Sequence, residues 1–141
     1  HEMWKYGNRD LVLNLYGTVT EKKPYLNIQK EGFTYEQLRE IFANTDILVA
    51  PSIWYETFGF TVLEALSYCV PVIVSDRVGA KDIVGNGGII VPAGDVEKLK
   101  EAIESLNENT LKKLRKAIQE EITIKTWTQF VSENYELYAR V

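Results

Sequence analysis

The sequence predicts an α/β protein with a Rossmann-like parallel sheet covered by helices on both faces. Two observations support this prediction. Short apolar runs alternate along the chain with segments of helical periodicity, as in folds built from strand–helix–strand units. The apolar runs are also continuous, whereas strands with one face in water alternate between apolar and polar residues. We therefore expect parallel strands that are buried on both faces.

Five segments are predicted to be strands because they are short apolar runs, several of which are closed by glycine or proline. They span residues 11–16, 25–30, 46–50, 70–74 and 88–91. Pro71 lies near the start of its strand, where a missing N–H is tolerated. Short turns from strand to helix carry the function in such folds, because ligands bind beyond the carboxyl ends of the strands.

Helices are expected where capping residues precede an apolar stripe. Thr34 and Gln37 form a capping box ahead of one helix, and Asp95 is placed to cap another. Helical periodicity continues in three further segments, 61–68, 111–118 and 127–138. Cys69 follows one of these helices at a position that often needs a positive φ.

Length and composition limit the function. With 141 residues, the chain is one domain's worth of sequence. The net charge of −4 argues against binding to nucleic acid. The single cysteine excludes an internal disulfide and fits a reducing, cytoplasmic location. The chain begins without an initiating Met and reads as part of a longer protein.

A basic cluster lies on one of the predicted helices. Its members are Lys112, Lys113, Arg115 and Lys116. Such a cluster is either a solvated face or a contact with anionic lipid. The second reading would place the protein at the inner face of a membrane.

The stretch from Trp54 to Asp76 contains the candidate site. Glu56 and Glu64 lie on either side of Gly59, where a loop enters a helix. Helix N-termini carry N–H groups without intrahelical partners and favour anions such as a diphosphate. Two carboxylates touching a phosphate would repel it, so they are better used as acceptors for hydroxyl groups on either side. A ligand that carries hydroxyl groups, then phosphates and then further hydroxyl groups is a nucleotide sugar.

The segment PSIWYETFGFTVLEALSYCVPVIVSD resembles the Glu-x7-Glu signature of the family 4 retaining glycosyltransferases. The segments NIQKEGF and NGGIIVPAGDVEKLKEAI are similar to flanking parts of that family. The resemblance implies the C-terminal, donor-binding half of a two-domain GT-B fold over residues 1–141, lacking its first strand–helix unit. Residues 124–141 would be the terminal crossover helix, and an N-terminal acceptor domain would lie outside the chain.

The resemblance also implies roles for individual residues. Glu56 would contact the transferred sugar as the catalytic residue, and Glu64 would hold the ribose hydroxyls. The backbone of Phe58, Gly59 and Phe60 would contact the sugar and the diphosphate of the donor. The backbone of the other two donor-binding residues, Gln29 and Lys30, would contact the base. The Phe58 and Phe60 side chains are expected to be core.

The implied activity is that of a retaining hexosyltransferase-type enzyme using a UDP- or GDP-sugar in bacterial polysaccharide or glycolipid synthesis. The family works without metal or cofactor, and the chain has no Asp-x-Asp motif. The family's diphosphate-binding Arg and Lys lie before the first residue of this chain, so the isolated fragment is expected to be inactive.

Two other classes remain open. A hydrolase could use Glu56 and Glu64 as an acid and nucleophile pair. In such an enzyme, however, a helix N-terminus that begins with a glycine between the two carboxylates has no role. A non-catalytic parallel α/β module, either nucleotide-binding or receiver-like, is the second alternative. A receiver needs acidic residues at the end of its first strand, and LVLNLYG supplies none.

Overall fold

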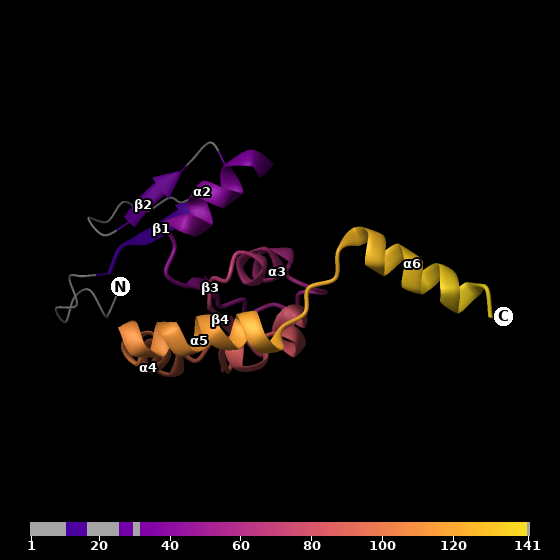
Figure 1. Cartoon of the computed structure of the whole chain (residues 1–141). Coiled ribbons are helices and arrows are strands. Elements are labelled where there is room, and N and C mark those ends of the chain that lie inside the picture. The colour runs from indigo at the N-terminus through magenta and orange to yellow at the C-terminus, as the bar shows by residue number, and fades with distance from the viewer. Residues whose placement is uncertain (1–10, 17–25, 30–31, 141) are drawn as a thin grey trace. The chain divides into compact units, whose positions relative to one another are not determined.

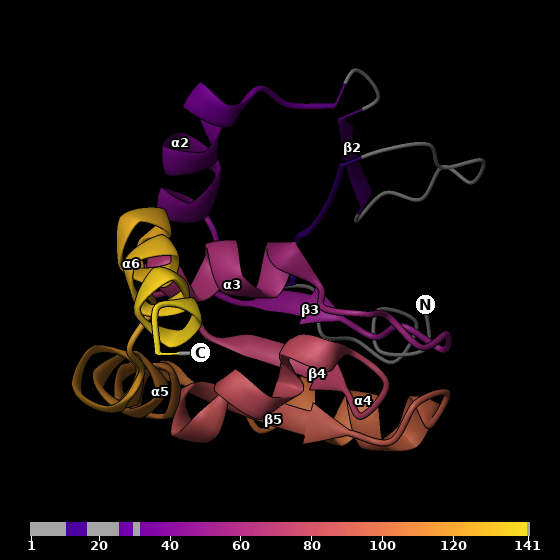
Figure 2. The same ribbon diagram turned by 90° about the vertical axis from the view of Figure 1, so that its right-hand side faces the viewer.

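The computed structural model describes residues 11–16, 26–29 and 32–140. The chain divides into two compact units, His1–Thr45 and Asp46–Val141, which are described separately. Figure 1 labels helices and strands of both units, and β5 is labelled in Figure 2. All strand pairs are parallel in the described residues, which confirms the predicted α/β class.

The first unit contains a two-stranded parallel sheet and a short helix. Strand β1 (Leu13–Tyr16) pairs with β2 (Leu26–Gln29), with Leu13 opposite Leu26. The 3₁₀ turn η1 (Tyr35–Gln37) leads into α2 (Leu38–Ala43). The predicted capping box is present, because the Thr34 N–H donates to Gln37 Oε1 at 2.8 Å.

The prediction that residues 11–16 form a buried strand is wrong as regards burial. The strand forms, but Leu13 is 43% exposed and Tyr16 is also exposed. A strand is buried on both faces only when its sheet neighbours and covering helices are present. In the described part of this unit, one partner strand and one six-residue α-helix are too few to cover it.

The second unit contains a three-stranded parallel sheet in the order β3-β4-β5. The strands are β3 (Leu48–Ala50), β4 (Val72–Ser75) and β5 (Gly88–Val91). Figure 2 shows β4 between the other two. Every residue of β4 is buried, as expected for a central strand with helices on both faces.

Two helices cover opposite faces of this sheet. Ile73 packs with Val91 and with Ala102 of α4 (Val96–Glu104). Its neighbours Val72 and Val74 point to the other face because side chains alternate along a strand. That face is covered by α3 (Phe60–Ser67), whose buried residues are Val62, Ala65 and Leu66. The predicted arrangement of helices on both faces is therefore confirmed for this unit.

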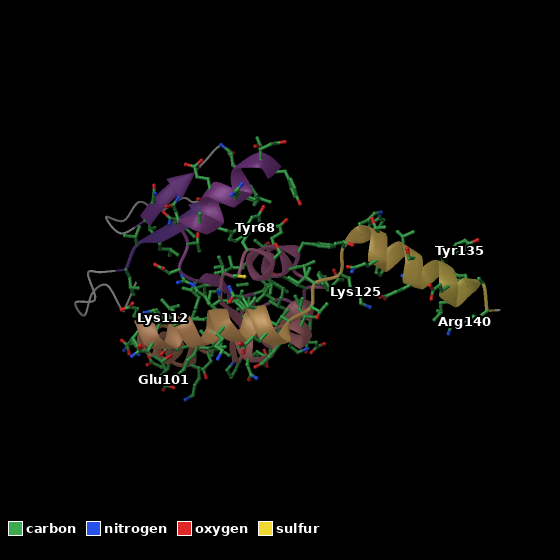
Figure 3. The ribbon with its side chains drawn as sticks, in the orientation of Figure 1. Tyr68, Glu101, Lys112, Lys125, Tyr135 and Arg140 are labelled. Carbon is green, nitrogen blue, oxygen red and sulfur yellow. The ribbon has the colours of Figure 1, made fainter. Side chains whose placement is uncertain are left out.

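Two short turns and a further helix complete the unit. The short turns η2 (Gly79–Ile83) and η3 (Gly85–Gly87) precede β5, and α5 (Glu108–Glu121) follows α4. Gly87 lies directly under α5, since a methyl group on it would come within 2.5 Å of Ile118 Cγ1. Charged side chains such as Glu101 and Lys112 lie on the outside of these helices (Figure 3).

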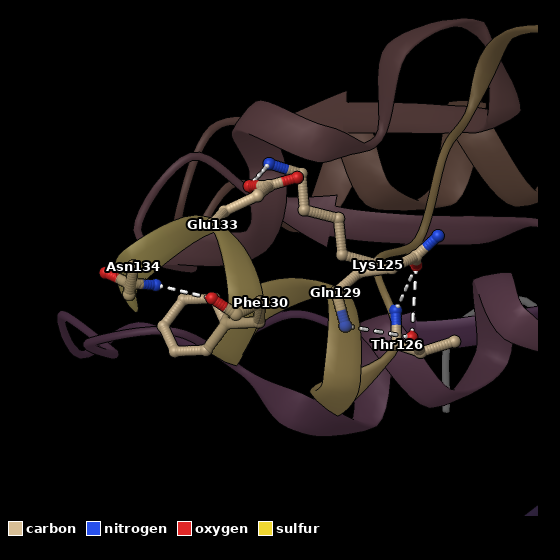
Figure 4. Close-up of polar contacts among 6 residues, drawn as sticks. All are labelled: Lys125, Thr126, Gln129, Phe130, Glu133 and Asn134. Carbon is tan, nitrogen blue, oxygen red and sulfur yellow. Dashed lines mark hydrogen bonds and ion pairs between the residues drawn. The ribbon is translucent and has the colours of Figure 1, made fainter. Parts of the chain in front are cut away.

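Helix α6 (Trp127–Tyr138) begins with a second capping box. The Thr126 N–H donates to Gln129 Oε1 at 2.8 Å, and the Gln129 N–H donates back to Thr126 Oγ1 at 3.3 Å (Figure 4). Trp127 and Phe130 stack with ring centroids 5.7 Å apart. Both rings are largely exposed.

The C-terminus of α3 is a Schellman motif, in which a residue in the left-handed conformation ends the helix. The Cys69 N–H donates to Leu66 O at 3.0 Å, and the Val70 N–H donates to Ala65 O at 2.9 Å. Cys69 has φ +57° and is the one non-glycine residue with positive φ in the described part of the chain. The sequence-based expectation of a positive φ is therefore confirmed.

We expect Cys69→Gly to raise the free energy of unfolding slightly or to leave it unchanged. Glycine relieves a left-handed strain of roughly 1 kcal/mol, which its greater freedom in the unfolded chain offsets in part. Cys69→Ala is the matched control, because it removes the thiol but keeps the Cβ. Urea denaturation of both variants measures the difference, and a glycine variant less stable than the alanine variant contradicts the argument.

Candidate functional site

The loop that carries Glu56 is held against the segment that follows β4. We call residues 51–59 the Glu56 loop. Ser75 Oγ donates to Ser52 O at 2.6 Å, and the Glu56 N–H donates to Arg77 O at 3.0 Å. The Gly79 N–H donates to Glu56 O at 3.2 Å. Glu56 and Val78 thus form an isolated parallel bridge, which continues the pairing of β3 with β4 beyond the sheet.

Gly59 joins this loop to α3. It is the N-cap of the helix and has φ +92°, a left-handed conformation that favours glycine. A methyl group on Gly59 would lie 2.7 Å from Val78 Cγ1 and 3.3 Å from Glu56 Oε2. The glycine is therefore required by its backbone conformation and by close packing, and one oxygen of the Glu56 carboxylate lies beside it.

The two predicted carboxylates lie on either side of this helix start. Glu56 is exposed on the loop, and Glu64 is half-buried in the second turn of α3. Within the described ranges, no residue donates a hydrogen bond or forms an ion pair to either carboxylate. Both carboxylates are therefore available as acceptors for a ligand.

The N-terminus of α3 lies between them. Val62 N–H donates to Gly59 O at 3.0 Å, and the preceding N–H groups of a helix have no partner four residues back. Such groups and the helix dipole favour an anion. The arrangement places two carboxylates beside the N-terminus of a helix at the carboxyl edge of a parallel sheet, where ligands bind in such folds.

The prediction that the side chains of Phe58 and Phe60 are core is wrong for Phe60, which is 71% exposed. Phe60 is the first residue of α3, and its ring packs on that of Phe58 at 5.1 Å between centroids. Phe58 is half-buried. The first helical position turns the side chain away from the sheet, which explains the exposure.

The predicted base-binding residues belong to the other unit. Gln29 is the last residue of β2, and Lys30 lies outside the described residues. Glu56, Phe58, Gly59, Phe60 and Glu64 share one loop–helix segment of the second unit.

The chain matches the family described as Glycosyl transferases group 1 over residues 14–124. The chain belongs to this family. It is 32% identical over 83 residues to the O-antigen chain mannosyltransferase B of Escherichia coli, a match that covers 58% of this chain and 22% of that relative. The chain therefore spans about a quarter of the length of such relatives.

Solved structures support the fold of this group 1 glycosyltransferase chain. A glycosyltransferase from Rickettsia africae has a TM-score of 0.74 at 19% identity, and the match covers 98% of this chain and 42% of that one. The Anabaena protein HepE, in complex with UDP-glucose, has a TM-score of 0.62 at 20% identity. That match covers 81% of this chain and 33% of HepE.

Two residues beside the site were not predicted from the sequence. Asp76 Oδ1 accepts the Ala93 N–H at 2.9 Å, which ties the end of β4 to the turn after β5. Arg77 Nη1 donates to Ile53 O at 2.8 Å. Their position directly after the buried strand β4 was the available signal, because strand ends carry the functional loops in parallel sheets.

The basic cluster on α5 is mostly paired with carboxylates. Lys112 contacts Glu108 at 2.6 Å, Arg115 contacts Asp46 at 3.2 Å and Lys116 contacts Glu120 at 3.7 Å. These pairs favour a solvated face over a lipid contact.

No group of three or more His, Cys, Asp or Glu residues that could hold a metal ion is found among the described residues. In those residues no helix is both long and apolar enough to cross a membrane.

We expect Gly59→Ala to lower the free energy of unfolding of the second unit strongly. The positive φ costs about 1–2 kcal/mol for a residue with a Cβ, and the contact with Val78 adds about 1–3 kcal/mol of overpacking. Gly85→Ala is the matched control, because Gly85 has φ +49° and no atom within 4 Å of the added methyl. Equal losses in the two variants, measured by urea denaturation, would show that the Val78 contact relaxes freely.

Proposed function

We propose that this chain is the donor-binding half of a retaining hexosyltransferase-type glycosyltransferase that uses a UDP- or GDP-sugar. The arrangement that supports this proposal is the start of α3 with Glu56 before it and Glu64 inside it, both without partners among the described residues. Family membership and the UDP-glucose in the HepE complex agree with a nucleotide-sugar donor.

Each group has one role in this proposal. Glu64 accepts hydrogen bonds from the ribose hydroxyls, and Glu56 contacts the transferred sugar. The backbone of Phe58, Gly59 and Phe60 binds the diphosphate and sugar hydroxyls, while the backbone of Gln29 and Lys30 meets the base. Catalysis then rests on stabilising the leaving diphosphate by backbone N–H groups and cations from outside this chain, without a metal or cofactor.

The extent of the domain is part of this proposal. The described strands form a parallel pair, β1-β2, and a parallel triplet, β3-β4-β5. We infer that a strand and helix outside these 141 residues complete the domain, and that residues 124–141 cross to an acceptor domain.

The cellular role in this proposal follows the relatives. The name of the E. coli relative refers to O-antigen chains, and we infer synthesis of a bacterial polysaccharide or glycolipid. The enzyme would act in the cytoplasm, and a place at the inner face of the membrane would depend on the acceptor, since the basic cluster of α5 is mostly paired with carboxylates. The isolated chain would not transfer sugar, because the acceptor site and the diphosphate-binding cations lie elsewhere.

Glu64→Gln in the full-length enzyme should weaken binding of UDP or GDP about 10- to 100-fold. The substitution removes charge-assisted hydrogen bonds worth roughly 1.5–3 kcal/mol. Isothermal titration calorimetry measures the dissociation constant, with Glu104→Gln on the exposed end of α4 as the matched control. Equal affinity of wild type and Glu64→Gln for UDP or GDP would contradict the proposal that Glu64 binds the ribose hydroxyls.

Glu56→Ala should reduce sugar transfer while the affinity for UDP or GDP stays within about threefold of wild type, or ~0.7 kcal/mol. The reason is that Glu56 contacts the sugar and not the nucleotide. Calorimetry and turnover are measured on the same preparation. A large loss of nucleotide affinity would show that the roles of the two carboxylates are reversed.

A further inference from the structure

Arg77 contacts the Glu56 loop at three successive places. Its Nη1 donates to Ile53 O at 2.8 Å. Its guanidinium carbon lies 4.9 Å from the centre of the Tyr55 ring. Its main-chain oxygen accepts the Glu56 N–H at 3.0 Å. Arg77 therefore contacts Ile53, Tyr55 and Glu56, two residues that precede Glu56 closely and Glu56 itself.

Arg77 is itself anchored at the end of a buried strand. Its N–H donates to Ser75 Oγ at 3.3 Å, and Ser75 is 1% exposed at the end of β4. The same hydroxyl donates to Ser52 O. The contacts of Arg77 thus join the loop to β4, the strand of this unit in which every residue is buried.

The Glu56 carboxylate needs such support. None of the described residues bonds to its oxygens, so its position depends on the backbone that carries it. Tyr55 and Trp54, which precede it, are 83% and 77% exposed and have little packing of their own. Without the guanidinium, residues 53–55 would keep few contacts.

We propose that Arg77 is a positioning residue that holds Glu56 for contact with the sugar ring of the donor. The inference rests on the proposed function, because Glu56 is the sugar-contacting carboxylate there. Arginine suits the task since its planar fork can bond a carbonyl and stack on an aromatic face at the same time. A lysine can reach the Ile53 carbonyl but cannot reproduce both contacts.

The test uses the full-length enzyme and two donor pairs, UDP with UDP-glucose and GDP with GDP-mannose. Calorimetry first identifies the pair that wild type binds. The variants are Arg77→Ala, Arg77→Lys and the matched control Arg115→Ala, which removes an equal charge whose partner, Asp46, lies before β3. For each variant we would measure the dissociation constants of the nucleoside diphosphate and of the nucleotide sugar, the kcat for hydrolysis of the donor by water, and the melting temperature.

For Arg77→Ala we expect the nucleoside diphosphate affinity to stay within about threefold, because the ribose and diphosphate contacts are untouched. The kcat of hydrolysis should fall about 10- to 100-fold, as expected when a reacting group is displaced by about 1 Å. Arg77→Lys should recover part of this loss, and Arg115→Ala should behave as wild type.

The proposal is overturned if Arg77→Ala keeps the wild-type kcat, or if diphosphate affinity falls as much as kcat does. If Arg77→Ala is too unstable to measure, Tyr55→Leu replaces it. That variant removes the ring under the guanidinium and should also lower kcat with little change in diphosphate affinity. Failure of wild type to bind either donor pair would instead reject the proposed function, so the two failures are distinguishable.

Discussion

The parallel pairing of β3 with β4, continued past the end of the sheet, is the interaction on which the candidate site depends. Within the sheet, Ala50 lies opposite Val74. Beyond it, Glu56 forms a bridge with Val78. Because β4 is buried between two strands and two helices, it provides a fixed edge for the loop. The loop is therefore ordered by backbone hydrogen bonds to its neighbour, although most of its own side chains are exposed.

Local signals in the sequence predicted the elements well. The Thr34–Gln37 capping box and the Asp95 cap depend on residues three apart, and Asp95 Oδ1 accepts the Lys98 N–H at 2.9 Å as expected. The left-handed conformation of Cys69 was also predictable, since it depends on the end of one helix. Glu56, Gly59 and Glu64 could be found for the same reason, because they lie within nine consecutive residues.

Features set by distant neighbours could not be predicted in this way. Arg77 and Ile53 are 24 residues apart, and they meet only because of the register between β3 and β4. From the sequence, Arg77 is an ordinary exposed charge after a strand. The exposure of Leu13 is a similar case, because an apolar run specifies a strand but not the helices that must cover it.

The glycine between the two carboxylates is explained by the supports on its two sides. The Glu56 loop is tied to the segment after β4, and α3 is tied to the sheet by its buried residues Val62 and Leu66. The chain must turn sharply between these supports, and the left-handed conformation of Gly59 makes that turn. Any Cβ there would meet Val78 and press on Glu56. Each carboxylate is thus carried by backbone that is fixed independently of any ligand, and a site built in this way does not need its ligand in order to form.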